Sequence, residues 1–262
     1  MRYALVVLAL ALGGCPGTKG YVRSYPEPKI ADVVARFAKQ RAQLSSFSGQ
    51  SVMDYWLGKD RVKGEVLVMG KAGAHVRFLA QSPAGDATLA EMACDGKQFA
   101  FLDLQKNCQL TGPCDVSSIA QFLRVELEPD DFVALALGTP PILPNPTGTV
   151  TWNGKAGHEL VELTSPEGKQ TFEIDARDGK WDVIHSQRLT PDGKLVWSVD
   201  NYDFTSVKDE AGAMQRVPSR SNLKSAQDHT DLSVEWKERA LNKPLDDAKF
   251  VLTIPAGLAS CK

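Results

Sequence analysis

Short runs of alternating apolar and polar residues, separated by turn dipeptides, constrain the fold of this chain more than any other feature. In its second half the turns fall at Asn153-Gly154, Glu167-Gly168, Asp178-Gly179 and Asp192-Gly193. Such dipeptides close β-hairpins, because glycine and asparagine accept the positive φ angles of tight turns. The runs between them are typical of half-buried strands, as in Leu232, Val234 and Trp236. We therefore expect a meander of about 10 or 11 antiparallel strands.

Three helices are expected to accompany this meander. Residues 29–44 carry apolar side chains at helical spacing, and two shorter helices are expected near 119–123 and 130–137. An antiparallel sheet this long curls, because neighbouring strands twist against each other. The helices can then fill its concave side. The predicted fold is mainly β (α+β): an unclosed antiparallel β-barrel, or half-barrel, with helices plugging the concave face.

The first residues indicate a lipoprotein signal. Arg2 precedes an apolar run, Tyr3 to Leu12, which is shorter than the roughly 20 residues that cross a bilayer. Gly13-Gly14-Cys15 follows and resembles the lipobox of bacterial lipoproteins. We expect a signal peptide over 1–14, a lipid on Cys15, a lipidated flexible tether over 15–28 and a folded domain over 29–262. The alternative is an ordinary secretory signal with a chance cysteine.

The expected location is the bacterial cell envelope, with the protein lipid-anchored. Pro16 stands where many lipoproteins of the inner membrane carry aspartate, which favours the outer membrane, facing the periplasm. The chain carries 30 basic and 32 acidic side chains, a formal net charge of −2. This balance, without a basic patch, argues against a nucleic-acid partner.

The remaining cysteines, Cys94, Cys108, Cys114 and Cys261, form an even set in an oxidising compartment, which predicts two disulfides. Hairpin turns near 95–96 and 105–107 place Cys94 and Cys108 at opposite ends of one strand. At ~3.3 Å per residue they would be ~23 Å apart, whereas a disulfide needs Cα atoms within about 7 Å. We expect either Cys94 or Cys108 to pair with Cys114, and the other with Cys261.

No pattern for catalysis, metal or cofactor binding is found. The histidines are scattered, the cysteines lack zinc-site spacing, and no nucleophile or phosphate-loop motif is present. We therefore expect no catalytic residue, no metal and no cofactor. Five tryptophans could stack against sugars, but at about one per strand they fit a core or a cavity lining better: Trp56, Trp152, Trp181, Trp197 and Trp236.

The order of features over residues 79–143 resembles the LolB family, the outer-membrane acceptors of lipoproteins, and their soluble relatives in the LolA family. The resemblance rests on Ser82-Pro83-Ala84-Gly85, Asp95-Gly96, Leu110-Thr111-Gly112, Phe122-Leu123 and Leu137-Gly138. Leu241-Asn242-Lys243-Pro244-Leu245, near the end, resembles the closing segment of the carriers. The resemblance implies an unclosed β-barrel with a helical lid, which agrees with the alternation pattern.

One loop departs from the family. In LolB proteins a protruding loop with a Pro-Leu-Gly core carries an exposed leucine implicated in delivering cargo. Here Pro83, Ala84 and Gly85 form the candidate delivery loop, and Ala84 replaces the leucine. A methyl group supplies little of the ~1.5–3 kcal/mol that a leucine side chain gains on burial. The resemblance therefore implies cargo binding more than delivery.

The leading hypothesis is a non-enzymatic lipoprotein whose hydrophobic cavity binds lipid or lipoprotein acyl chains, with a role in lipoprotein localisation to the outer membrane. Alternation does not say which face of a strand points inward, but it selects six candidate lining residues: Phe78, Phe99, Phe101, Phe172, Trp197 and Trp236. The cavity is expected between the sheet and the helices, near Phe122 and Phe132. The alternative is a structural or sensing lipoprotein on the same scaffold, with a filled interior and another envelope protein as partner. A third hypothesis, an enzyme with an unrecognised site, lacks a motif.

Overall fold

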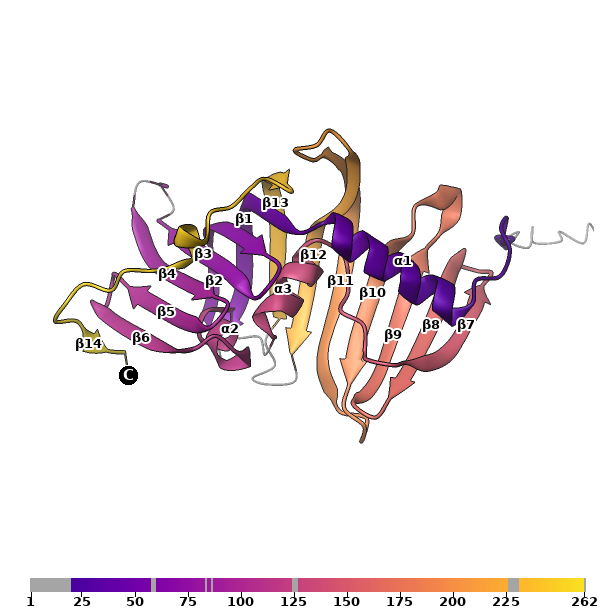
Figure 1. Ribbon diagram of the computed structural model, residues 1–262, viewed down its shortest axis with the longest axis horizontal. Coiled ribbons are helices and arrows are strands. Elements are labelled where there is room, and N and C mark those ends of the chain that lie inside the picture. Colours follow the sequence, from indigo (N-terminus) through magenta and orange to yellow (C-terminus); the bar gives the residue numbers. More distant parts are fainter. Residues whose placement is uncertain are drawn as a thin grey trace, which may run out of the picture.

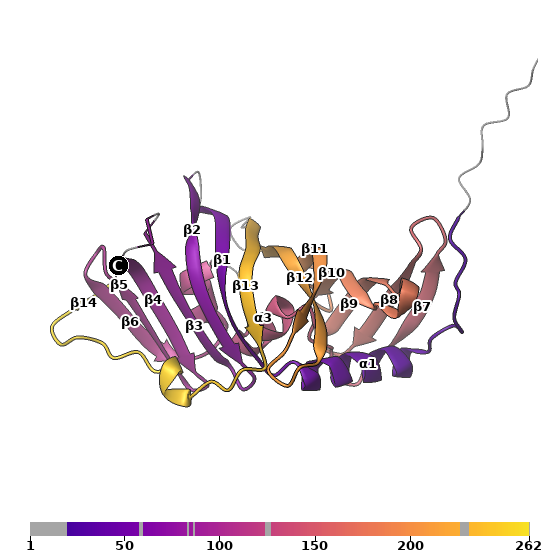
Figure 2. The same cartoon turned by 90° about the horizontal axis from the view of Figure 1, so that it is seen from above.

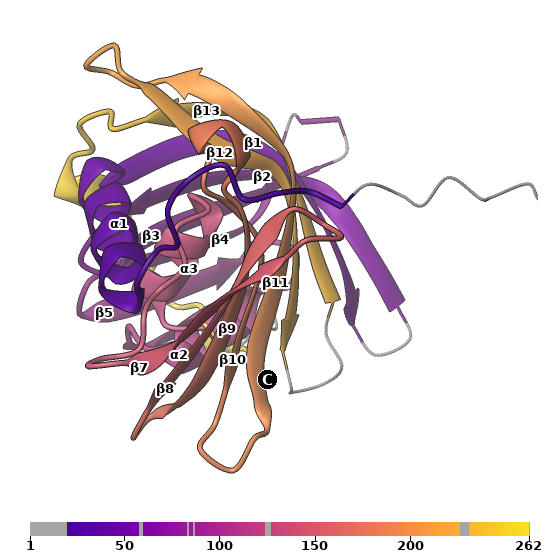
Figure 3. The same ribbon diagram turned by 90° about the vertical axis from the view of Figure 1, so that its right-hand side faces the viewer.

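The protein folds as a curved sheet with three helices on its concave side, in a computed structural model that describes residues 20–57, 60–82, 84–85, 87–123, 127–225 and 231–261. The sheet has 14 strands, more than the sequence pattern predicts, and does not close into a barrel. Its curvature is clearest from the end of the molecule (Figure 3). The predicted half-barrel class is confirmed.

The elements follow the chain in two meanders. The first contains β1 (Ser46–Leu57), β2 (Asp60–Lys71), β3 (His75–Gln81), β4 (Thr88–Asp95), β5 (Gln98–Asp103) and β6 (Cys108–Pro113). The second contains β7 (Thr147–Asn153), β8 (His158–Ser165), β9 (Gly168–Asp175), β10 (Asp182–Leu189), β11 (Leu195–Lys208), β12 (Met214–Ser225) and β13 (Asp231–Leu241). The short β14 (Ala259–Ser260) follows. The helices are α1 (Ile30–Gln43), α2 (Val116–Leu123) and α3 (Pro129–Ala136), and the 3-10 turns are η1 (Arg177–Gly179) and η2 (Asp247–Phe250).

The two meanders meet where β13 pairs with β1. The strand order is β14-β6-β5-β4-β3-β2-β1-β13-β12-β11-β10-β9-β8-β7, antiparallel except for β14 beside β6. Phe47 of β1 lies opposite Leu241 of β13, and both side chains are buried. The edge strands β7 and β14 consequently lie at opposite ends of the long axis (Figures 1 and 2).

The apolar side chains divide into two cores rather than one. The larger core lies under α2 and α3, where alternate residues of the strands, such as Val66 and Val68 of β2, meet the helices. The smaller core lies under α1, where Val33 and Phe37 pack on β8, β9 and β10. Figure 1 shows α1 along the second meander and α3 beside the first. Each helix group thus covers its own part of the concave face.

Part of the segment predicted as a tether contacts the β7–β8 hairpin. The Tyr21 amide donates to the Gly154 carbonyl over 2.7 Å, and Arg23 and Tyr25 donate to Glu159 of β8. Cys15 and the signal residues lie outside the described part of the chain, so their roles remain predictions. None of the described helices is both long enough and apolar enough to cross a bilayer.

Both disulfides follow the predicted scheme. Cys94 pairs with Cys114 and Cys108 with Cys261, with Cα atoms 5.5 Å and 4.9 Å apart. Cys94 and Cys108 lie on β4 and β6, two strands that are separated by β5, and they are not linked to each other. Cys114 immediately precedes α2, and Cys261 follows β14. The two bridges therefore fix the start of the α2–α3 segment and the C-terminal end of the chain.

Candidate functional site

The concave face of the first meander, covered by α2 and α3, is the candidate ligand site. Alternation along β3 directs Val76 and Phe78 inward, and Phe132 of α3 packs on them with ring centroids of Phe78 and Phe132 5.0 Å apart. Phe78 and Ile119 are 0% exposed and Phe132 is 2% exposed. The space between sheet and helices, where an open cavity was expected, is therefore occupied by side chains.

Trp236 of β13 belongs to the same core, at the place where the second meander meets the first. Its ring meets Phe47 edge-on at 5.4 Å between centroids. The Trp236 Nε1 atom is buried without a hydrogen-bond partner among the described residues. An unpaired N–H group in an apolar interior costs free energy that an acceptor from a ligand would recover.

Arg239 supplies a partly buried cation beside this tryptophan. The guanidinium lies 5.1 Å from the Trp236 ring centroid and donates to the Ala136 carbonyl over 3.2 Å and to the Pro218 carbonyl. Desolvation lowers the Arg239 pKa to about 10, because burial penalises the charged form. Its described partners are main-chain carbonyls and an aromatic ring, not a carboxylate. Gly49 lies opposite and leaves room for the arginine stem, since a Cβ there would lie 2.9 Å from Arg239 Cγ.

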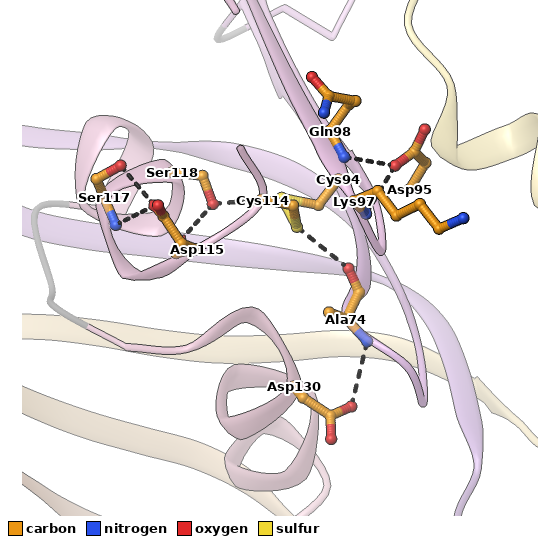
Figure 4. The surroundings of a disulfide bond; sticks show 10 residues. All are labelled: Ala74, Cys94, Asp95, Lys97, Gln98, Cys114, Asp115, Ser117, Ser118 and Asp130. Carbon is orange, nitrogen blue, oxygen red and sulfur yellow. Dashed lines mark hydrogen bonds between the residues drawn. A yellow bond between two sulfur atoms is a disulfide. The ribbon is translucent and has the colours of Figure 1, made fainter. Parts of the chain in front are cut away.

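Polar contacts at the start of each helix hold the α2–α3 segment on the sheet. At the start, the Cys94–Cys114 bridge is joined by Ser118, whose Oγ lies 3.3 Å from Cys94 Sγ (Figure 4). At α3, Asp130 accepts from the Gly73 amide over 3.0 Å and from Arg41 of α1 over 2.8 Å. These polar contacts thus lie at the ends of the helices, and the apolar faces of the helices fill the site.

Asp131, the next residue of α3, lines a small hollow of about 150 Å³ between the two cores. Arg41 and Arg188 also line it. Desolvation raises the Asp131 pKa to about 6, even though both arginines oppose the shift. A carboxyl group with a pKa of about 6 therefore lies where α3 meets the second meander.

The structure brings most of the candidate lining residues together. Phe78, Phe99, Phe132, Trp197 and Trp236 belong to the larger core, and the partly buried Phe101 packs against it. Phe172 instead belongs to the smaller core, where its ring lies 5.5 Å from that of Phe37. Phe122 lies in α2, but its side chain is outside the described part of the structure. That the six grouped residues line a ligand site remains a prediction.

The candidate delivery loop joins β3 to β4. Ala84 and Gly85 are exposed there, and the Gly85 amide donates to the Ser82 carbonyl over 2.8 Å, which forms a turn. Pro83 lies outside the described residues. The loop is exposed, but its tip residue Ala84 carries only a methyl group.

Sequence reasoning missed Arg239, Asp131 and Phe47 as members of the site. Phe47 could have been found, because it begins the inward series Phe47, Gly49, Ser51 and Met53 of β1. Arg239 gave no such signal, because the sequence does not distinguish a charged residue at an inward position from a solvated one until its partners are known.

A larger hollow of about 540 Å³ lies on the convex face, lined by Leu67, Met69 and Leu79 among others.

Comparison with known proteins supports the fold assignment. The sequence matches no protein-family model and no curated protein. A LolA superfamily protein from Nitrosomonas europaea superposes with a TM-score of 0.55 and 11% identity, over 83% of this chain and 97% of the other. This chain shares its fold with that LolA superfamily protein.

Two further structures share this LolA-like fold. A domain named as an outer membrane lipoprotein-sorting protein, from Vibrio parahaemolyticus, has a TM-score of 0.54 at 9% identity, over 82% of this chain and 94% of its own. A DUF1329 family protein from Desulfovibrio piger has a TM-score of 0.53 at 13% identity, over 84% and 95%. At these identities the likeness concerns the fold alone. The order of residues that resembles the LolB family implied the same kind of fold.

Proposed function

We propose that this chain is a lipid-anchored, non-enzymatic protein of the bacterial cell envelope that binds acyl chains of lipids or lipoproteins under α2 and α3. The observation that carries the proposal is the aromatic concave core closed by two short helices that are attached at their ends. Acyl chains would take the place of the helical side chains. Affinity would then come from burial of methylene groups at ~0.8 kcal/mol each.

Two polar groups favour an acylated ligand over a plain hydrocarbon. The unpaired Trp236 Nε1 belongs to the ring that the partly buried Arg239 guanidinium contacts. Ester or amide carbonyls beside an acyl chain could accept hydrogen bonds from both. Pockets for small molecules commonly combine an apolar lining with few polar groups of this kind.

Titration with a diacylated lipopeptide, followed by tryptophan fluorescence, tests the proposal. Trp197 and Trp236 lie in the larger core, so their emission should change saturably. Phe132→Ala removes a ring that occupies the site and should lower the dissociation constant. Phe172→Ala truncates a matched ring in the smaller core and should leave the dissociation constant unchanged. A fluorescence signal that does not respond to lipopeptide contradicts acyl-chain binding.

A second function is favoured by a different observation. The concave side is filled, whereas the convex hollow exposes Leu67, Met69 and Leu79 beside Glu238. This arrangement suits a structural or sensing protein that binds another envelope protein on its sheet surface. Cross-linking in cells from a photoreactive residue at Met69, compared with one at exposed Lys106, separates the two functions. A specific adduct at Met69 with no lipopeptide response supports the second.

A further inference from the structure

The segment that follows the lipidation site is fixed along the β7–β8 hairpin. The Tyr21 amide donates to the Gly154 carbonyl, and Trp152 Nε1 donates to the Tyr21 carbonyl over 3.1 Å. Gly157, with φ of 78°, makes room for the tyrosine, because a Cβ there would lie 2.7 Å from the Tyr21 ring. The hairpin turn is therefore shaped to receive this segment.

A buried carboxylate fixes the next residues of the segment. Glu159 is 0% exposed and lies on the same inward face of β8 as Val161 and Leu163. Arg23 Nη2 and the Tyr25 hydroxyl each donate to its carboxylate over 2.9 Å, and Arg23 Nε forms an ion pair with it at 2.8 Å. Undocking would remove both partners of this carboxylate, and breaking a buried ion pair is strongly destabilising. The segment therefore stays in place while the sheet is folded.

This docking limits how far the domain can move from its anchor. Cys15 precedes Gly20 by five residues. At about 3.5 Å per residue, their Cα atoms are at most ~18 Å apart. A flexible tether over 15–28 would have allowed far more freedom. With the segment docked, only the few residues between Cys15 and Gly20 set the distance between the anchor and the folded domain.

Exposed apolar side chains lie at this same end of the molecule. Tyr21 is 51% exposed and Val22 is 87% exposed, and exposed Lys155 occupies the neighbouring hairpin turn. Figures 1 and 2 show the segment at the β7 end, far from β6 and β14. Tyrosine and lysine suit the bilayer interface, where the apolar part of the side chain is buried and the polar tip stays in water.

We propose that the β7–β8 end, with Tyr21, Val22 and Lys155, faces the membrane and contacts its lipid surface, so that the half-barrel is held in one orientation. This inference rests on the lipidation of Cys15 proposed above. The long axis then points away from the bilayer, with β6 and β14 at the distal end. The α2–α3 site lies toward that distal half.

Lysine reactivity on vesicles tests the orientation. The chain from Cys15 onward contains all described residues, and with both disulfides formed Cys15 is its one free thiol. Coupling this thiol to a maleimide lipid in phosphatidylcholine–phosphatidylglycerol vesicles makes the test independent of lipidation in cells. Acetylation of Lys155 should be several-fold slower on vesicles than in solution. Lys106, 79% exposed in the distal β5–β6 turn, should react equally in both.

A lengthened tether provides the variant that leaves the fold untouched. Inserting a long Gly-Ser linker between Thr18 and Lys19 should restore the reactivity of Lys155 on vesicles. Glu159→Gln should do the same by undocking the segment, whereas Glu173→Gln on the adjacent strand should not. Equal reactivity of Lys155 on vesicles and in solution would overturn the proposal, as would protection that survives the insertion. Failure of lipidation in cells would overturn the anchor proposal and with it the orientation in cells, whereas the vesicle comparison tests the membrane-facing end by itself.

Discussion

Arg239 of β13 donates a hydrogen bond of 3.2 Å to the carbonyl of Ala136, the last residue of α3. The last four carbonyls of a helix lack partners within the helix, so this contact both caps α3 and joins it to the sheet. The same guanidinium reaches Pro218 of β12. One side chain thus connects α3 to two neighbouring strands of the sheet, β13 and β12.

Arg239→Leu should loosen α3. The variant loses both hydrogen bonds and the contact with Trp236, and we expect a loss on the order of 1–3 kcal/mol in the free energy of unfolding. Amide exchange over 129–139 should accelerate more than elsewhere, as measured by mass spectrometry. Arg220→Leu is the control, because Arg220 forms a solvent-exposed pair with Asp203 and such pairs contribute about 0–1 kcal/mol. Uniform acceleration along the whole chain would contradict a local role.

Asp131 should make the protein less stable as pH rises. Its pKa is raised from 3.8 to about 6 in the folded state, so the folded protein binds more protons than the unfolded one between these values. The stabilisation is present in full below pH 4 and is lost as pH rises through 6. A shift of this size corresponds to at most about 3 kcal/mol.

Asp131→Asn removes this titration. Between pH 5 and 7.5 the unfolding free energy of the variant should fall less than that of the original protein, as measured by urea denaturation. Comparing the difference between the two proteins cancels the other titrating groups, including Asp95 and Asp115, whose pKa values are lowered by hydrogen bonds. Parallel pH profiles would show that Asp131 ionises normally.

Gly70 and Gly64 of β2 should differ sharply when replaced by alanine. A Cβ at Gly70 would lie 2.5 Å from the Phe47 ring and 3.0 Å from Val133 of α3, so Gly70→Ala overpacks the larger core. We expect a loss of about 1–3 kcal/mol. At Gly64 the structure shows nothing within 4 Å of a new Cβ, so Gly64→Ala should be neutral or slightly stabilising. Thermal unfolding of both variants measures the difference.

Cys15→Ala should release the protein from the membrane without unfolding it. Residues 14–19, around Cys15, carry no apolar pattern of the kind that core elements show. Membrane fractionation after a salt wash should find the variant in the soluble fraction, with an unchanged melting temperature. A variant that still sediments with membranes would show that another feature holds the chain there.

The position of strands, turns and α1 could be predicted from the sequence, because each depends on neighbouring residues. The alternation in β8 and β9 and the turn at Glu167-Gly168 set a local hairpin whatever the rest of the chain does. The exclusion of a Cys94–Cys108 bridge also followed from local geometry, because the turns near 95–96 and 105–107 place the two cysteines at opposite ends of one strand. Alternation also selected Phe78 and Trp236 as candidate lining residues without saying which face of each strand points inward, and the structure places both in the larger core.

The partners of each inward face were decided only in the tertiary structure. Alternation identifies a face, but it does not say which helix covers it, so the division into two cores and the place of Phe172 under α1 were not predictable. Glu159 and its partner Arg23 are 136 residues apart. A charged group is stable in a core only when distant residues supply its hydrogen bonds. The sequence by itself therefore determined the curved sheet, and the tertiary contacts decided how it is filled and where the N-terminal segment docks.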